Sequence, residues 1–174
     1  MLTLCLLRHA KSSWQSPTLP DRDRPLASRG RAEAPLMGRA MAERGLLPQL
    51  VLCSSARRTR DTLDLVLPEL KVTPKVIYED SLYHASSAAM LEMLQGISTS
   101  GVGQVLLVGH NPELHALSLD LIGSGPKHMR ERLAEKLPTA GLVVIIFLDS
   151  AWKDVVVNSG ELKLFLTPRL AEED

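Results

Sequence analysis

The chain has 174 residues, of which 45% are hydrophobic and 23% charged, and its formal net charge is zero. This length favours a single domain over residues 1–174 with a sizeable core. The neutral balance argues against nucleic acid or an acidic membrane as partner, since both require a basic excess. Cys5 and Cys53 lie inside apolar runs, which does not indicate a disulfide framework and favours a reducing, cytoplasmic location. No run approaches the ~18–20 apolar residues of a membrane span.

The first 110 residues alternate between two patterns. Compact apolar runs predict strands buried on both faces, and segments with apolar side chains on one helical face predict helices between them. The expected strands cover residues 2–7, 50–53 and 103–109, and the expected helices cover residues 30–44, 57–67 and 86–97. Pro35 should kink the first helix or mark its effective start. This alternation predicts an α/β fold with a largely parallel sheet.

The chain after residue 115 is less regular. Residues 114–123 predict a helix ending at Gly123, and residues 125–138 a loop with a short helix. Two further apolar runs, at 142–148 and 161–166, predict strands that pair antiparallel at the sheet edge, joined by a hairpin region.

Polar side chains follow each of the three expected parallel strands. Arg8 and His9 end the first, "SSARRTRDT" (54–62) follows the second, and "GHNPE" (109–113) follows the third. Each alone has an ordinary explanation: a solvated strand end, a capped basic helix start, or a turn into a helix. Open parallel sheets bind ligands outside the carboxyl ends of their strands, however. Together the three segments predict a site with two histidines and at least one arginine.

Several motifs resemble a known family. "LLRHAKSSW", the spacing Ser54–Arg58–Thr62 and "LLVGHNP" resemble the histidine phosphatase superfamily and its phosphoglycerate-mutase-like members. "RHAKSSW", "DRDRPLASRG" and "EDSLYHAS" narrow the resemblance to bacterial phosphohistidine phosphatases of the SixA kind, over residues 2 to about 115. The resemblance implies a three-layer sandwich whose mostly parallel central sheet is flanked by helices. It also implies hydrolysis of phosphohistidine on a protein, such as a histidine phosphotransfer protein, through a covalent phosphohistidine intermediate and without a cofactor.

The resemblance also implies roles for four residues. His9 corresponds to the nucleophile, Arg8 and Arg58 to phosphate-binding arginines, and His110 to the second histidine. A phosphoryl group carries nearly two negative charges, which the planar guanidinium groups suit, and His110 can donate a further hydrogen bond. The same cations should lower the pKa of His9 and favour the neutral imidazole that a nucleophile needs.

The assignment of Arg58 has a close competitor in Arg57. A step of four residues from Ser54 favours Arg58, because Ser54, Arg58 and Thr62 then share one helix face. The family usually has proline after the serine, where this chain has Ser55.

Two residues after the nucleophile, Lys11 and Ser12, are expected to contact substrate. No metal site is expected, because His110 and His115 are five residues apart and no cysteine or carboxylate cluster completes a ligand set.

The acid that would protonate a leaving group is missing from its usual position. Ester-cleaving members of the family commonly place a glutamate two residues past a leucine, after the middle strand. Here that position, two past Leu82, is His84, which either acts on the leaving group or caps the pocket. Glu79 and Asp80 lie nearby but out of register.

Two alternative functions remain open from the sequence. One is a metal-independent phosphatase of small phosphate esters or sugar phosphates. The other is a non-catalytic module that binds phosphoproteins. A mere binder could lose His9 without penalty, so this alternative is disfavoured by the intact set of Arg8, His9, Arg58 and His110.

Overall fold

The computed structural model describes residues 1–98, 100–149 and 151–173. Its strands are β1 (Leu2–Arg8), β2 (Leu50–Ser54), β3 (Lys75–Glu79), β4 (Gln104–Gly109), β5 (Ile122–Ser124), β6 (Leu142–Phe147) and β7 (Gly160–Leu166). Its α-helices are α1 (Ser28–Glu43), α2 (Arg57–Leu70), α3 (Ser87–Gln95), α4 (Glu113–Leu121), α5 (Lys127–Glu135) and α6 (Pro168–Glu173). Three short 3₁₀ helices are η1 (Asp21–Asp23), η2 (Asp80–Tyr83) and η3 (Trp152–Asp154).

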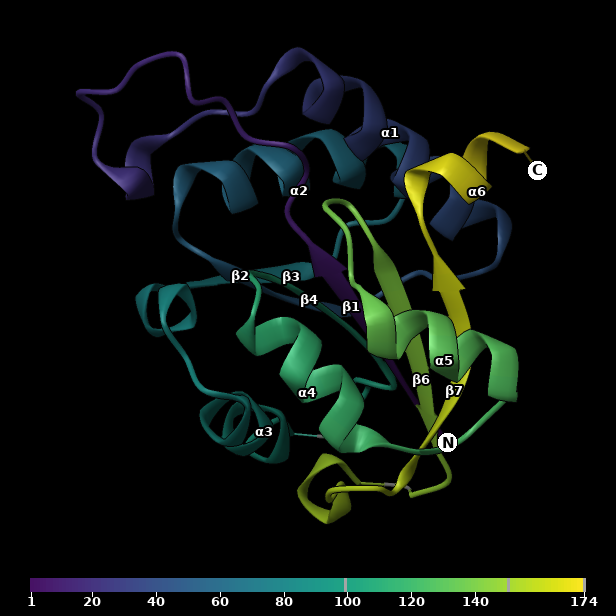
Figure 1. Ribbon diagram of the computed structural model, residues 1–174. Coiled ribbons are helices and arrows are strands. Elements are labelled where there is room, and N and C mark those ends of the chain that lie inside the picture. The colour runs from purple at the N-terminus through teal and green to yellow at the C-terminus, as the bar shows by residue number, and fades with distance from the viewer. Residues whose placement is uncertain (99, 150, 174) are drawn as a thin grey trace.

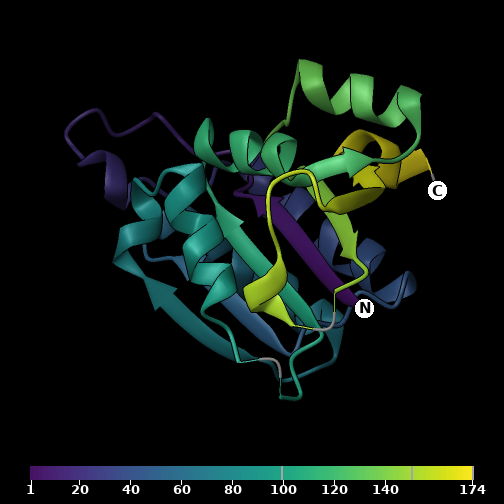
Figure 2. The ribbon, with the colours of Figure 1, turned by 90° about the horizontal axis from the view of Figure 1, so that it is seen from below.

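The strands form one sheet in the order β3-β2-β4-β1-β6-β7-β5. Strands β1 to β4 pair parallel, as do β5 and β7, whereas β6 is antiparallel to both β1 and β7. Figure 1 shows α1, α2 and α6 on one face of the sheet and α3 and α4 on the other, and Figure 2 gives a second view of these layers. The expected three-layer sandwich with a mostly parallel sheet is confirmed.

The central strands are apolar throughout because both of their faces are covered. Side chains alternate between faces along a strand, so Leu4 and Leu6 of β1 pack on the side of α3 and α4. Cys5 and Leu7 pack on the side of α1 and α2, together with Cys53. Both cysteines are free, and burial raises the pKa of each thiol to about 12. Among the described residues, no helix is both long and apolar enough to cross a membrane.

The second half of the sheet differs from expectation at its edge. The helix expected over 114–123 ends at Leu121, and Ile122–Ser124 form β5, which is the edge strand. The antiparallel pairing of β6 with β7 is confirmed, but the expected edge placement is wrong, because β6 lies beside β1. A strand of three residues is too short to show a period of its own.

Two further features of the first half were not predicted. The opposite edge of the sheet is β3, whose half-buried and exposed residues gave no continuous apolar run. Helix α1 begins at Ser28 and contains Pro35, so the alternative in which this proline marks the start of the helix is wrong.

A close approach between α1 and the chain after His9 predicts the effect of one substitution. A Cβ on Gly30 would overlap the backbone oxygen of Lys11, which is already bonded to the amide of Ala27 at 2.8 Å. Gly30→Ala should therefore lower the free energy of unfolding by about 1–2 kcal/mol, as overpacking outweighs the gain in helix propensity. Urea titration measures this. Gly103→Ala is the control, because no atom lies within 4 Å of its Cβ position; equal midpoints for both variants would contradict the prediction.

Candidate active site

The carboxyl ends of three neighbouring parallel strands bring the predicted histidines together. Arg8 of β1 is in register with Gly109 of β4, and the amide of His9 donates to the Gly109 carbonyl at 3.1 Å. The rings of His9 and His110 are consequently 5.4 Å apart, centroid to centroid. Nε2 of His110 and Oγ of Ser54, the last residue of β2, form a hydrogen bond of 2.8 Å. The predicted convergence of these strand ends is what the structure shows.

The protonation state of His9 follows from its contacts. Its side chain is buried, and Nδ1 lies 2.8 Å from the carbonyl oxygen of Ala10. Because a carbonyl only accepts, Nδ1 carries the proton and Nε2 keeps its lone pair. Burial lowers the pKa of His9 to about 4, against the opposing effect of the Ala10 hydrogen bond. The charges of Arg58, Arg8 and Arg24 contribute to the same lowering of the pKa, so the imidazole is neutral at pH 7.

The two candidate arginines of α2 lie in different environments. Arg58 is 8% exposed and is close enough to lower the pKa of His9 and of Arg8 by its charge. Arg57 is exposed and pairs with Asp61 at 3.5 Å. The structure therefore places Arg58, and not Arg57, beside His9.

The spacing that singled out Arg58 has a different structural basis from the one expected. Ser54 ends β2 and α2 begins at Arg57, so only Arg58 and Thr62 share a helix face. Thr62 Oγ1 accepts from the amide of Ala10 at 2.9 Å and donates to the carbonyl of Arg58 at 2.7 Å. All three residues of the pattern still contribute contacts to the cluster.

A turn in the last third of the chain holds Arg8 and His9 in place. Nη1 of Arg8 donates to the carbonyl of Leu137 at 3.1 Å, and its amide donates to the carbonyl of Gly141 at 3.1 Å. The carbonyl of His9 accepts from the amide of Ala140 at 3.0 Å, and Ala140 has a φ of 58°, unusual for a residue with a side chain. The sequence predicted no contact between this segment and the site, because "LPTAG" (137–141) carries only a turn signal.

Buried polar atoms in the cluster suit an anion. Within the described residues, Arg8 Nε and His110 Nδ1 are buried without a hydrogen-bond partner. Asn111 Oδ1 is also buried without a partner among them, but as an acceptor it does not suit an anion. Burial lowers the pKa of His110 to about 3, with smaller contributions from His9 and Arg58. The two arginines and the neutral imidazole of His110 offer several N–H donors to phosphoryl oxygens, while His9 presents its Nε2 lone pair. In the same described ranges, no three His, Cys, Asp or Glu side chains gather where they could hold a metal ion.

Three residues that the sequence did not single out also belong to this cluster. The Asp21 carboxylate, at the start of η1, accepts from Arg58 Nη2 at 3.1 Å, from Arg24 Nη1 at 2.9 Å and from the Tyr83 hydroxyl. The Tyr83 ring meets the His110 ring edge-on, with centroids 5.4 Å apart. "DRDRPL" and "DSLY" contain these residues, but neither segment has a period that would indicate which side chains turn inward.

The other predicted contacts lie around this cluster. Ser12 is buried and its Oγ accepts from Arg24 Nη2 at 2.6 Å, while Lys11 is half-buried. His84 is exposed, and its ring lies 4.2 Å from the Tyr83 ring.

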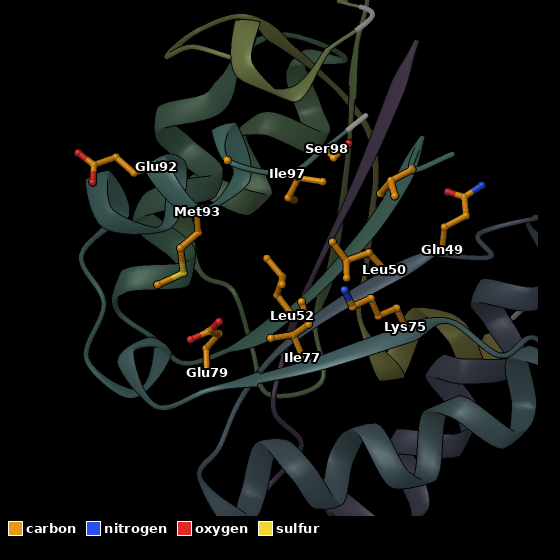
Figure 3. Close-up of a pocket in the computed structure, with 12 residues that line it drawn as sticks. Gln49, Leu50, Leu52, Lys75, Ile77, Glu79, Glu92, Met93, Ile97 and Ser98 are labelled. Atoms are coloured by element: carbon orange, nitrogen blue, oxygen red, sulfur yellow. The ribbon is translucent and has the colours of Figure 1, made fainter. Parts of the chain in front are cut away.

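The two acidic alternatives to His84 are Glu79 and Asp80, and within the described residues neither bonds to His9 or His110. Glu79 lines a separate cavity of about 420 Å³ between β2, β3 and α3, whose walls include Leu52, Ile77 and Met93 (Figure 3). None of the proposed phosphate-binding residues lines this cavity. Asp80 is exposed and bonds to Arg22 at 2.8 Å and to Ser55.

Comparison with known proteins agrees with this geometry. The sequence model of the Histidine phosphatase superfamily (branch 1) matches residues 4–83. The solved structure of a candidate phosphohistidine phosphatase SixA from Agrobacterium tumefaciens is 32% identical, with a TM-score of 0.81 over 96% of this chain and 98% of that one. The chain belongs to the histidine phosphatase superfamily. An uncharacterized relative from Mycobacterium leprae is 34% identical over 94% of this chain and 100% of its own length.

A solved structure with lower sequence identity shares the fold. The protein histidine phosphatase SixA, solved with tungstate, is 21% identical and has a TM-score of 0.76 over 97% of this chain and 98% of that one. Membership of the histidine phosphatase superfamily supports phosphatase activity for this chain.

The buried histidines predict how stability depends on pH. His9 and His110 have pKa values of about 4 and 3 in the folded chain, against about 6.5 when unfolded. Between these values the unfolded chain binds more protons, so their contribution to stability is complete above pH 6.5 and is lost as the pH falls toward 4. NMR titration of the imidazole nitrogens measures the pKa values, with His9→Gln to assign the His9 signals. A His9 pKa of 6.5 or higher would contradict the prediction.

Proposed function

We propose that this protein hydrolyses phosphohistidine on a protein substrate through a covalent intermediate on His9. Arg8, Arg58 and His110 hold the phosphoryl group in this proposal, and no metal or cofactor takes part. The observation that carries it is a neutral His9 whose Nε2 lone pair is free, set among buried guanidinium groups.

The proposed reaction has two displacements at phosphorus. The lone pair of His9 Nε2 forms a bond to phosphorus, and the substrate P–N bond breaks with its electron pair moving to the leaving nitrogen. A substrate imidazole protonated on its other nitrogen leaves neutral and takes no proton from the protein. Water then attacks phospho-His9 and inorganic phosphate leaves. Because Nδ1 of His9 keeps its proton and donates it to the Ala10 carbonyl in a hydrogen bond, His9 is itself released as a neutral imidazole.

The carboxylates around the site favour a P–N bond over an alkyl ester. An alkoxide needs a positioned acid, which typically contributes ~10²–10⁴-fold, whereas imidazole, with a reference pKa of ~6.5, needs far less help. Glu79 lines a separate cavity, and Asp80 is bound by Arg22. The hydrogen bond from Tyr83, with those from Arg24 and Arg58, lowers the pKa of Asp21 to about 2, so this carboxylate is ionised and donates no proton at pH 7.

The proposed substrate is a phosphorylated protein, such as a histidine phosphotransfer protein in the cytoplasm. Relatives named SixA, which are described as phosphohistidine phosphatases, support this choice. Lys11, Ser12 and His84 are the proposed contacts to the substrate beyond its phosphoryl group. His84 is the exposed one of these, beside Tyr83.

The function is tested by comparing three substrates with the purified protein. We expect kcat/KM for a phosphohistidine protein to exceed that for an alkyl phosphate by at least about 100-fold, the low end of an acid's contribution. An aryl phosphate should fall between. Enzyme quenched in detergent at alkaline pH should carry an acid-labile phosphoryl group that is lost in His9→Ala, and chelators should change nothing. Equal turnover of a sugar phosphate would instead assign a small-ester phosphatase, and phosphoprotein binding without turnover a binding module.

A pair of variants tests the arginine assignment. Arg58→Ala should lower kcat/KM by roughly two to three decades, because a charged contact to the transition state is lost. Arg57→Ala is the matched control: its guanidinium is exposed and pairs with Asp61, so it should cost far less. The reverse ranking would refute the role of Arg58.

A further inference from the structure

Asp21 joins three elements that surround the site. Its carboxylate accepts from Arg24 through Oδ1 and from Arg58 and Tyr83 through Oδ2. Its backbone oxygen accepts from Arg58 Nη1 at 2.9 Å. Arg58 lies on α2 and Tyr83 on η2, whereas Asp21 begins η1 in the long segment between β1 and α1. Figure 1 shows this segment extending beyond α2 before it returns to α1.

These contacts restrict the Arg58 guanidinium. The Arg58 side chain is 9% exposed, and a buried cation requires a partner. Asp21 engages both terminal nitrogens, Nη1 through its backbone and Nη2 through its carboxylate. Two such bonds fix the plane of the guanidinium, which has five N–H donors in a rigid fork. Three donors then remain for a phosphoryl group.

Tyr83 extends the same arrangement to His110. Its hydroxyl is bound by Asp21, its ring lies 5.7 Å from Arg58 Cζ, and its ring centroid lies 5.4 Å from that of His110. Asp21 therefore contacts Arg58 directly and reaches His110 through Tyr83.

We infer that Asp21 is a positioning residue, which holds Arg58 and Tyr83 in the orientation that receives the phosphoryl group. The inference rests on the proposed function for the identity of that group. The competing possibility is that Asp21 occupies Arg58 in place of the phosphoryl group and must be displaced by it. The two possibilities predict opposite effects when the carboxylate is removed.

The experiment measures the affinity for inorganic phosphate by calorimetry and kcat/KM on a phosphohistidine peptide. Asp21→Ala should weaken both by about 10- to 100-fold, the range for losing a hydrogen bond to a charged group. Asp21→Asn should recover part of the loss, because its single amide oxygen can still accept from Arg58 but not from Arg58 and Arg24 at separate atoms. Phosphate binding by Asp21→Ala that equals or exceeds that of the parent would overturn the inference.

A matched control lies two residues away. Asp23 also belongs to η1 and is exposed, and within the described part of the chain its side chain makes no hydrogen bond or ion pair. Asp23→Ala removes the same charge from the same segment and should leave both quantities unchanged. A loss as large as that of Asp21→Ala would show a general effect of charge and would refute positioning.

The fluorescence of Trp14 distinguishes loss of positioning from detachment of the whole segment between β1 and α1. Of the two tryptophans, Trp14 is 72% exposed with Arg24 Cζ 3.1 Å from its ring centroid, while Trp152 is fully buried. Arg24 also binds Ser12 and the backbone of Ser13, so the segment stays anchored without Asp21. Iodide quenching of Trp14 should be the same in Asp21→Ala as in the parent. A marked rise in quenching together with the loss of affinity would show detachment and overturn the inference.

Tyr83→Phe tests the route through the hydroxyl. It should lower phosphate affinity less than Asp21→Ala and add little in the double variant, since both act through one network. Fully additive losses would exclude this route.

If the parent protein turns over no phosphohistidine but Asp21→Ala still weakens phosphate binding, the proposed function fails and the positioning role stands. If the parent turns over phosphohistidine and Asp21→Ala does so equally well, the positioning role fails and the proposed function stands.

Discussion

The position of one proton on His9 determines what this site can do. The Ala10 carbonyl accepts from Nδ1, which leaves the lone pair on Nε2. Burial and the neighbouring arginines keep a second proton off the ring. The cations suited to binding a phosphoryl group thus add to the effect of burial in keeping His9 neutral. Replacing Arg8 or Arg58 with an uncharged residue would weaken anion binding and also raise the pKa of His9.

The topology of the sheet places residues distant in sequence around that imidazole. The carboxyl ends of the parallel strands β1, β2 and β4 lie side by side, which brings Ser54 and His110 to His9. Strand β6 runs the other way, with Leu142 opposite Leu7, so it begins where β1 ends. The turn that precedes β6 consequently lies against Arg8 and His9 and supplies carbonyls and an amide to them. An antiparallel neighbour thus supports a site that the parallel strands create.

Sequence reasoning succeeded where a period or a strand end defined the position. Arg8, His9 and His110 follow apolar runs, and Arg58 was favoured by its spacing; all four lie in one cluster. It failed for side chains on irregular segments. Asp21 and Tyr83 come from short 3₁₀ helices, whose few residues show no face, and they meet only because the segment after β1 folds back over α2 and η2. The two edge strands were missed for different reasons. Strand β3 is only partly buried and so has no continuous apolar run, and β5 has too few residues to show an alternating pattern.

The carboxyl groups around the site are poorly suited to donate a proton to a leaving group. The hydrogen bond from Tyr83, together with Arg24 and Arg58, lowers the pKa of Asp21 to about 2 and keeps its carboxyl group ionised. Donors and cations arranged as an anion would need them therefore disfavour a protonated carboxylic acid among them. An acid for ester cleavage would have to stand apart from them, but Glu79 faces another cavity and Asp80 is bound by Arg22 and Ser55. Such a site suits substrates whose leaving group carries its own proton, and a protonated phosphoimidazole is one.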